Sequence, residues 1–438
     1  MKVMKFGGTS VGSAERIKNV ANLIVSRGRN VVVLSAMSGT TNTLVEISDY
    51  LSKGNAVGAK ETLNALEIKY AGVIAELYST SDAVQEATEA VAKSISFIRG
   101  LNERSYSSLD AKEILAQGEL MSTALMNIYL KEQGVKSVLL PALDFMRTDK
   151  NGEPDTEFIR EKFNESISAH QDAQIILTQG FICRNAYGEV DNLQRGGSDY
   201  SASLLGAAMH ADEIEIWTDI DGMHNNDPRF VDGTRPVSEL HFEEAAELAY
   251  FGAKILHPTC VLPAKLNNIP VRLLNTMDPD AKGTVIYNAG ATHTIKAVAA
   301  KDNITAIKIK SGRMLLAYGF LRKVFEIFET HRTSIDMIVT SEVGVSVTID
   351  NTSCLQAIVD DLKKFGTVTV DKDMVIICVV GDLEWQNRGF EAEVVNALKD
   401  VPVRMISYGG SNYNISLLVR KSDKIKALNL LSERLFNK

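Results

Sequence analysis

Short apolar runs alternate with longer amphipathic stretches up to about residue 288. The short runs are rich in β-branched residues, and the longer stretches repeat their apolar positions at helical spacing. Strands are predicted at 31–35, 136–140, 174–178, 213–218 and 270–274. Helices are predicted at 14–28, 42–53, 110–133, 155–169, 199–211 and 241–253, with a long helical excursion over 55–108. Continuous apolar strands that alternate with helices indicate an α/β fold with a mainly parallel sheet covered on both faces.

The pattern changes after residues 276–293, where short strands and single helices begin to repeat. Both copies follow the order β-α-β-β-α, which is the ferredoxin-like plan. The first copy is predicted at 304–371 and the second at 374–436. Each copy opens its first helix with Gly-Phe, at Gly319-Phe320 and at Gly389-Phe390.

The second copy lacks a last strand, and the segment 294–301 alternates like a strand without belonging to the first copy. We therefore expect 294–301 to complete the sheet of the second module, so that the first module is inserted within the second. This hypothesis fails if 294–301 pairs with the first module or with no strand. The predicted domains are 1–290, 303–371, and 292–302 plus 372–438.

Composition narrows the possible partners. The 438 residues carry a formal net charge of −8, which argues against nucleic acid because a basic face is the usual footprint there. No apolar run approaches the roughly 18 residues that a membrane span needs, and the N-terminal residues lack the apolar stretch of a secretion signal. The four cysteines are widely separated, as expected for free thiols in a reducing compartment. We therefore expect a cytoplasmic protein that binds neither nucleic acid nor membrane.

Residues 5–12 place a lysine, two adjacent glycines and two hydroxyls where the first strand should hand over to the first helix. Glycines allow close approach of the backbone to a ligand, and the N-terminus of a helix attracts anions. Lys5 adds a full positive charge, so these residues suit a transferring phosphoryl group. From spacing alone, a plain strand-turn-helix corner with an exposed lysine is an equally good interpretation.

Further motifs strengthen the phosphate interpretation, although no Gly-x-x-x-x-Gly-Lys-Ser/Thr loop is present. A hydroxyl-rich loop at 35–43 follows a predicted strand, and Glu119 follows a Gln-Gly pair. A second diglycine, Gly196-Gly197, lies between Arg195 and Asp199 and also precedes a helix. The stretches 217–223 and 251–258 complete the set. Two Gly-Gly turns, each opening a helix, could hold one chain of phosphates from two sides.

Six such motifs in this order resemble the aspartokinases of the amino-acid kinase family with tandem ACT regulatory modules. The resemblance covers residues 2–436 and is greatest to the single-function, lysine-regulated type. It implies a three-layer αβα sandwich with a mainly parallel sheet, followed by two ferredoxin-like (βαββαβ) ACT modules. The implied reaction is ATP plus L-aspartate giving ADP plus 4-phospho-L-aspartate. Two alternatives stay open: another carboxylate kinase of the same fold, and an amino-acid-sensing ACT protein with an inactive kinase domain.

The resemblance also implies a role for individual residues. Lys5 would stabilise the transferring phosphoryl group and Asp199 would hold Lys5, although Asp199 could instead be a first-turn helix acid. The residues implied for aspartate are Ser35, Thr41, Glu119, Arg195 and Ser198. The residues implied for the nucleotide are Lys5, Gly7, Gly8, Gly196, Gly197, Thr218, Asp219, His224, Arg229 and Lys254. His224 departs from the family, which often has a tyrosine there. ATP chemistry implies Mg²⁺, for which the sequence shows no evident protein ligand.

The resemblance places an effector site in the first ACT module, with lysine as the first choice and threonine as the second. The implied contacts are Met314, Gly319, Phe320, Leu321, Ser334, Ile335, Asp336, Ser341 and Glu342. Asp336 is the expected partner of a ligand ammonium. Because the second module repeats Gly-Phe, the pair Gly319-Phe320 could instead be only a helix start and a core anchor. ACT pairs often form across a two-fold axis, so we expect a homodimer or a dimer of dimers.

Overall fold

The computed structural model describes residues 1–101, 106–193, 196–252, 258–290, 293–312 and 318–436. The chain forms two compact units, which are treated one at a time. The first contains residues 1–222 and 256–288, and the second contains residues 223–255 and 289–438. Residues 223–252, which the predicted domain 1–290 includes, belong to the second compact unit.

A mainly parallel sheet organises the first unit. Its strand order there is β3-β4-β2-β1-β7-β9-β10, and only β10 runs antiparallel to its neighbour β9. The strands are β1 (Lys2–Phe6), β2 (Asn30–Leu34), β3 (Ser137–Leu140), β4 (Ile175–Gln179), β7 (Ile214–Thr218), β9 (Val271–Asn275) and β10 (Thr284–Tyr287). Every residue of β2 and β4 is buried, as expected for strands covered on both faces. The α/β fold with a mainly parallel sheet is therefore confirmed.

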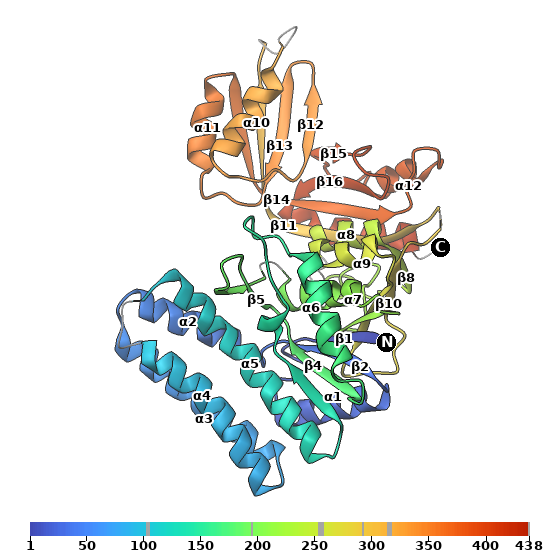
Figure 1. Ribbon diagram of the computed structural model, residues 1–438. Helices are drawn as coiled ribbons and strands as arrows, with labels where there is room; N and C mark the ends of the chain where they lie inside the picture. The colour runs from blue at the N-terminus through green and yellow to red at the C-terminus, as the bar shows by residue number, and fades with distance from the viewer. Residues whose placement is uncertain (102–105, 194–195, 253–257, 291–292, 313–317, 437–438) are drawn as a thin grey trace. The chain divides into compact units, whose positions relative to one another are not determined.

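Helices cover this sheet, and a two-stranded ribbon lies beside it. The helices are α1 (Ala14–Ser26), α2 (Thr40–Ser52), α3 (Ala56–Leu77), α4 (Ser81–Gly100), α5 (Ser108–Glu132), α6 (Thr156–Ser168), α7 (Gly197–Ala208) and α9 (Leu262–Leu266). The ribbon pairs β5 (Ile182–Arg184) with β6 (Val190–Asn192). The predicted excursion at 55–108 is a hairpin of α3 and α4 packed beside α2 and α5 (Figure 1). One large apolar cluster joins this hairpin to β1, β2 and α1.

Local chemistry explains where several of these helices begin. Ser13 caps α1 by accepting a hydrogen bond from the backbone of Arg16, and Ser107 forms a capping box with Asp110 at the start of α5. By contrast, α2 and α7 each follow a glycine in the left-handed region, with φ of 79° at Gly39 and 74° at Gly196. A glycine has no side chain with which to cap the first turn. The starts of α2 and α7 are therefore built differently from those of α1 and α5.

The second unit contains one antiparallel sheet of order β12-β13-β11-β14-β16-β15. Its strands are β11 (Ile295–Lys310), β12 (Ile338–Ser341), β13 (Gly344–Ile349), β14 (Thr367–Gly381), β15 (Met405–Ser407) and β16 (Asn414–Arg420). Its helices are α8 (Phe242–Tyr250), α10 (Phe320–Thr330), α11 (Leu355–Lys363), α12 (Phe390–Ala397) and α13 (Lys424–Phe436). A short strand, β8 (Glu239–His241), comes directly before α8. Two separate apolar clusters, one around α10 and α11 and one around α12 and α13, form the cores of two modules.

Two long strands run through both modules. The sequence predicted separate strands at 294–301 and 304–311, but the structure has one strand, β11, with a register shift between Lys301 and Ile304. Likewise, the strands predicted at 367–371 and 374–381 form β14. Residues 295–301 pair with 376–381 of the second module, as the insertion hypothesis requires. The exact domain boundaries stay a prediction. In the part of the chain that the structure describes, no helix is long and apolar enough to cross a membrane.

Candidate active site and regulatory surface

The carboxyl ends of the parallel strands meet at one edge of the first unit's sheet. Phe6 lies opposite Leu34, and Leu34 lies opposite Gln179, so β1, β2 and β4 end together. The loops that follow stay attached, because the backbone of Ser35 donates to Phe6 and that of Gly180 donates to Leu34. Ligands in open α/β sheets bind at such an edge. The loops that follow β1, β2 and β4 therefore lie together although they are far apart in the sequence.

An ion pair lies at this edge. Lys5 Nζ is 2.7 Å from Asp199 Oδ1, and the two side chains are 10% and 15% exposed. A nearly buried ammonium requires a compensating anion, and Asp199 supplies it from the first turn of α7. The pair joins the first diglycine turn to the second. Lys5 is therefore held in place rather than free on the surface, which rules out the exposed-lysine interpretation.

Glycines allow the surrounding loops to approach closely. A Cβ on Gly8 would lie 2.7 Å from the carbonyl oxygen of Ala36, and one on Gly118 would lie 2.8 Å from Cβ of Ala36. A Cβ on Gly180 would lie 2.5 Å from Ser198. Contacts below 3.0 Å would force a shift, so these glycines are needed for packing. They bring the turn after β1, the loop after β2, and the helices α5 and α7 into one cluster.

Glu119 is buried within this cluster. Its side chain on α5 accepts a hydrogen bond from the backbone of Ala36 at 3.2 Å through Oε1. The other oxygen, Oε2, is buried and has no hydrogen-bond partner among the described residues. Burial raises the pKa of Glu119 to about 7, against the opposing effect of the Ala36 hydrogen bond. A buried carboxylate oxygen without a partner is a ready acceptor for a ligand ammonium.

A buried polar network lies behind Glu119, and the sequence did not identify it. Thr123 donates to the backbone carbonyl of Glu119, and Gln179 donates from Nε2 to Thr123 Oγ1 at 2.8 Å. Ser122 donates to the carbonyl of Ser35 at 2.8 Å. These side chains fix the helix and the loop that carry candidate aspartate ligands. The available signal was their polarity inside apolar stretches, which is unusual unless partners are present.

The remaining candidates for aspartate occupy the same edge of the sheet. Ser35 is half-buried just after β2, Thr41 is exposed in the first turn of α2, and Ser198 is buried in the first turn of α7. Arg195 lies outside the described residues. Within the described part of the chain, the structure therefore brings Ser35, Glu119 and Ser198 into the cluster formed around Gly8, Gly118 and Gly180.

The candidates for the nucleotide divide between the two units. Thr218 ends β7 and accepts from the backbone of Ile220, and exposed Asp219 follows it. In the second unit, His224 Nδ1 is 3.0 Å from Thr234 Oγ1. Arg229 is 76% exposed and forms an ion pair of 2.6 Å with Asp227. Lys254 lies outside the described residues.

In the first module, the pair Gly319-Phe320 begins a helix and contributes to the core. Gly319, with φ of 78°, caps α10, and Phe320 is buried in the module's core. Gly389 and Phe390 take the same places in the second module, so Gly-Phe serves as a helix start and core anchor in both. Leu321, Ser334, Ser341 and Glu342 are exposed and Ile335 is half-buried, whereas Met314 lies outside the described residues.

Asp336 is already engaged within the protein. Its carboxylate is 1% exposed and lies 2.8 Å from Lys301 Nζ, and it accepts from the hydroxyl of Tyr250 at 2.9 Å. Both contacts reach Oδ1, while Oδ2 has no hydrogen-bond partner among the described residues. Burial raises the pKa of Asp336, and the pair with Lys301 opposes this rise. Lys301 also lies 3.0 Å from Asp350 and 4.4 Å from the ring centre of Tyr250.

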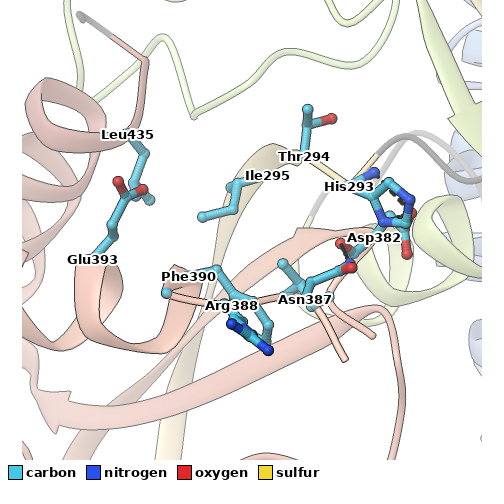
Figure 2. Close-up of a pocket in the computed structure, with 11 residues that line it drawn as sticks. His293, Thr294, Ile295, Asp382, Asn387, Arg388, Phe390, Glu393 and Leu435 are labelled. Atoms are coloured by element: carbon cyan, nitrogen blue, oxygen red, sulfur yellow. Dashed lines mark hydrogen bonds and ion pairs between the residues drawn. The ribbon is translucent and has the colours of Figure 1, made fainter. Parts of the chain in front are cut away.

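The second module carries an open pocket of about 390 Å³ at the start of α12 (Figure 2). Charged side chains of both signs line it, including Asp382, Arg388 and Glu393. Asp382 accepts a hydrogen bond of 2.8 Å from the backbone of His293.

Among the described residues, no group of three or more His, Cys, Asp or Glu side chains is arranged to hold a metal ion.

Comparison with known proteins agrees with this geometry. The profile of the amino acid kinase family matches residues 1–275, and that of an ACT domain matches residues 377–435. The chain is 34% identical to lysine-sensitive aspartokinase 3 of Escherichia coli (strain K12), with 99% of each sequence covered. The chain belongs to the amino acid kinase family and, within it, to the aspartokinases.

Solved structures give the same result. E. coli aspartokinase III in complex with aspartate and ADP superposes with a TM-score of 0.83 at 33% identity, and 100% of both chains is covered. The same enzyme in complex with lysine and aspartate also gives a TM-score of 0.83, at 34% identity, covering 100% of this chain and 99% of that one. The likeness therefore extends over both units of the fold.

Proposed function

We propose that this chain is an aspartate kinase, which transfers the γ-phosphoryl group of ATP to the β-carboxylate of L-aspartate. Two observations carry the proposal: the Lys5–Asp199 ion pair at the carboxyl edge of the sheet, and the buried, unpartnered oxygen of Glu119, whose other oxygen binds the loop after β2 at the same edge. The products are ADP and 4-phospho-L-aspartate, an acyl phosphate that enters the synthesis of lysine, threonine and methionine. The relative solved with aspartate and ADP supports this choice of substrates.

The reaction requires little proton chemistry. A free β-carboxylate has a pKa of about 3.9 and is ionised at neutral pH, so the nucleophile needs no general base. The obstacle is the approach of one anion to a polyanion, which catalysis overcomes by positioning and charge neutralisation. Lys5 would place its ammonium on the transferring oxygens, and Asp199 would keep it there. Glu119 would bind the α-ammonium of aspartate.

The other assignments remain part of the proposal. Arg195 suits the α-carboxylate because a guanidinium can bind it through two hydrogen bonds, and Ser35, Thr41 and Ser198 supply hydroxyls. The nucleotide would contact Gly7, Gly8, Gly196, Gly197, Thr218, Asp219, His224, Arg229 and Lys254. Mg²⁺ would bind mainly phosphate oxygens and water, which is its common mode in kinase sites. The cytoplasmic location and the homodimer, or dimer of dimers, are proposed with them.

An ADP-release assay tests the activity. We expect ADP release that depends on L-aspartate and is far weaker with L-glutamate in its place. Lys5→Met should abolish the dependence, whereas Lys60→Met, which changes an exposed lysine on α3, should not. Preference for glutamate would indicate another carboxylate kinase, and inactivity with every carboxylate would indicate an amino-acid-sensing protein.

We propose that lysine inhibits the enzyme through the first module. A relative that is 34% identical is named lysine-sensitive, and its structure with lysine superposes over the whole chain. The buried Oδ2 of Asp336 offers an acceptor for a ligand ammonium, although Lys301 already occupies Oδ1. Aspartate kinase rates with millimolar lysine or threonine decide the matter. Unchanged rates in lysine would exclude the first choice of effector.

A further inference from the structure

The α3–α4 hairpin has no role in the mechanism described so far. We propose that Lys69 on α3, supported by Tyr70, is a positioning residue that holds the aspartate-binding loop 35–41 in its working conformation. The proposal rests on the proposed function for the identity of the substrate, and on the contacts of the loop for its geometry.

The loop is held from three sides. From α5, Glu119 accepts from the backbone of Ala36 and Ser122 donates to the carbonyl of Ser35. From the first diglycine turn, the carbonyl of Gly8 accepts from the backbone of Ser38 at 3.0 Å. These two attachments come from elements that also carry candidate catalytic or substrate-binding residues. They leave the carbonyl of Ser38 and the hydroxyl of Thr40, at the tip of the loop, to be held from the third side.

The third attachment comes from the hairpin. Lys69 Nζ donates to the carbonyl of Ser38 at 2.6 Å, and the hydroxyl of Tyr70 lies 3.2 Å from Thr40 Oγ1. Tyr70 is fully buried, so its hydroxyl has a fixed direction. Two consecutive residues of one helix therefore hold both sides of Gly39, whose φ of 79° lets the loop turn into α2.

Lys69 brings a positive charge to the tip of the loop. Burial lowers its pKa, and in the described part of the chain no carboxylate lies within ion-pair distance of it. The side chain is only partly buried, so the ammonium also keeps contact with solvent. It adds positive charge beside the N-terminus of α2, where backbone N–H groups already favour an anion. This arrangement suits a loop that must present Ser35 and Thr41 to a dicarboxylate.

Steady-state kinetics of the full chain test the proposal. We expect Lys69→Met to raise KM for aspartate roughly tenfold, as the loss of one charge-assisted hydrogen bond implies. KM for ATP should change less than about twofold. Lys69→Arg should recover most of the loss because it keeps the charge and a donor, and Lys60→Met is the matched control on the same helix. A uniform fall in kcat with unchanged KM values would overturn the proposal.

A second measurement does not require activity. Amide hydrogen exchange of the peptide covering 36–41 should be faster in Lys69→Met than in the wild type and in Lys60→Met, without a change in the peptides of β1 and β4. Unchanged exchange would remove Lys69 from the positioning role even in an inactive enzyme. If the wild type shows no aspartate-dependent ADP release but exchange changes as expected, the choice of substrate fails and the loop attachment stands.

Discussion

The ionised form of Glu119 is expected to lower the stability of the folded protein when no ligand is bound. Its pKa is about 7 in the folded chain, compared with 4.5 for an ordinary glutamate. Between these two pH values the folded state keeps a proton that the unfolded state has released. Stability therefore falls as pH rises through this window, and the full cost is present above pH 7. At 1.36 kcal/mol for each pKa unit, the cost is about 3 kcal/mol.

The substitution Glu119→Gln removes the ionisation while keeping the shape. We expect this variant to be more stable than the wild type at pH 8 by roughly 2–3 kcal/mol, and to show little difference at pH 4.5. The two tryptophans make urea unfolding readable, because Trp217 is buried in the first unit and Trp385 is 74% exposed. Glu113→Gln, on the same helix, is the control and should behave like the wild type at both pH values.

The same carboxylate predicts the pH dependence of ligand binding. An aspartate ammonium pairs with the ionised form, so Glu119 must lose its proton first when the pH is below about 7. The dissociation constant for aspartate, measured by calorimetry, should rise roughly tenfold from pH 8 to pH 6 and should be flat above pH 8. In Glu119→Gln binding should be weak throughout. An affinity that is constant from pH 6 to pH 8, or a variant that is destabilised equally at all pH values, would refute the reasoning.

Three further results are expected. Lys5→Met should lower kcat about 10³-fold with little change in the far-ultraviolet circular dichroism, since lost charge stabilisation at a transferring group costs on this scale; a kcat within tenfold of the wild type would contradict it. Gly118→Ala should cost about 1–3 kcal/mol of stability in urea unfolding, because its Cβ would lie 2.8 Å from that of Ala36; an unchanged midpoint would show that the loop yields easily. Lys301→Met should shift the lysine concentration for half-inhibition at least threefold, because Lys301 occupies one oxygen of Asp336. The kcat in the absence of lysine should not change. Lys310→Met is the control, and equal behaviour of the two variants would count against the proposed effector contact.

The sequence predicted those parts of the fold that depend on local patterns. The strands at 31–35 and 174–178 lie within a residue of β2 and β4, because fully buried parallel strands have a distinct composition. The sequence pattern did not show that 295–310 is one strand. The strand is irregular near Asn303, where φ is 61° and the register with β14 shifts, and this irregularity interrupts the pattern as a break between two strands would. Pairing across modules is a tertiary property that periodicity does not contain.

The candidate site shows the same division. Lys5 and Asp199 were paired through the resemblance to a family, and the structure gives their distance. The hydrogen bond between Gln179 and Thr123 was not predicted, because the two residues lie 56 positions apart and only the fold shows that they meet. The engagement of Asp336 by Lys301 joins residues that are 35 positions apart, so the sequence could suggest the acid but not its partner.

The nesting of the two modules has a consequence for the order in which the chain can fold during synthesis. The first module is complete once residue 371 has been made, whereas the second must wait for β16 at 414–420. Until then the first half of β11 and the second half of β14 form an unfinished sheet with an open edge. Domains generally fold as units as the chain emerges, so we expect a transient intermediate with one module formed and an exposed apolar strand. Truncation before residue 414 should therefore produce an aggregating protein rather than a smaller folded one.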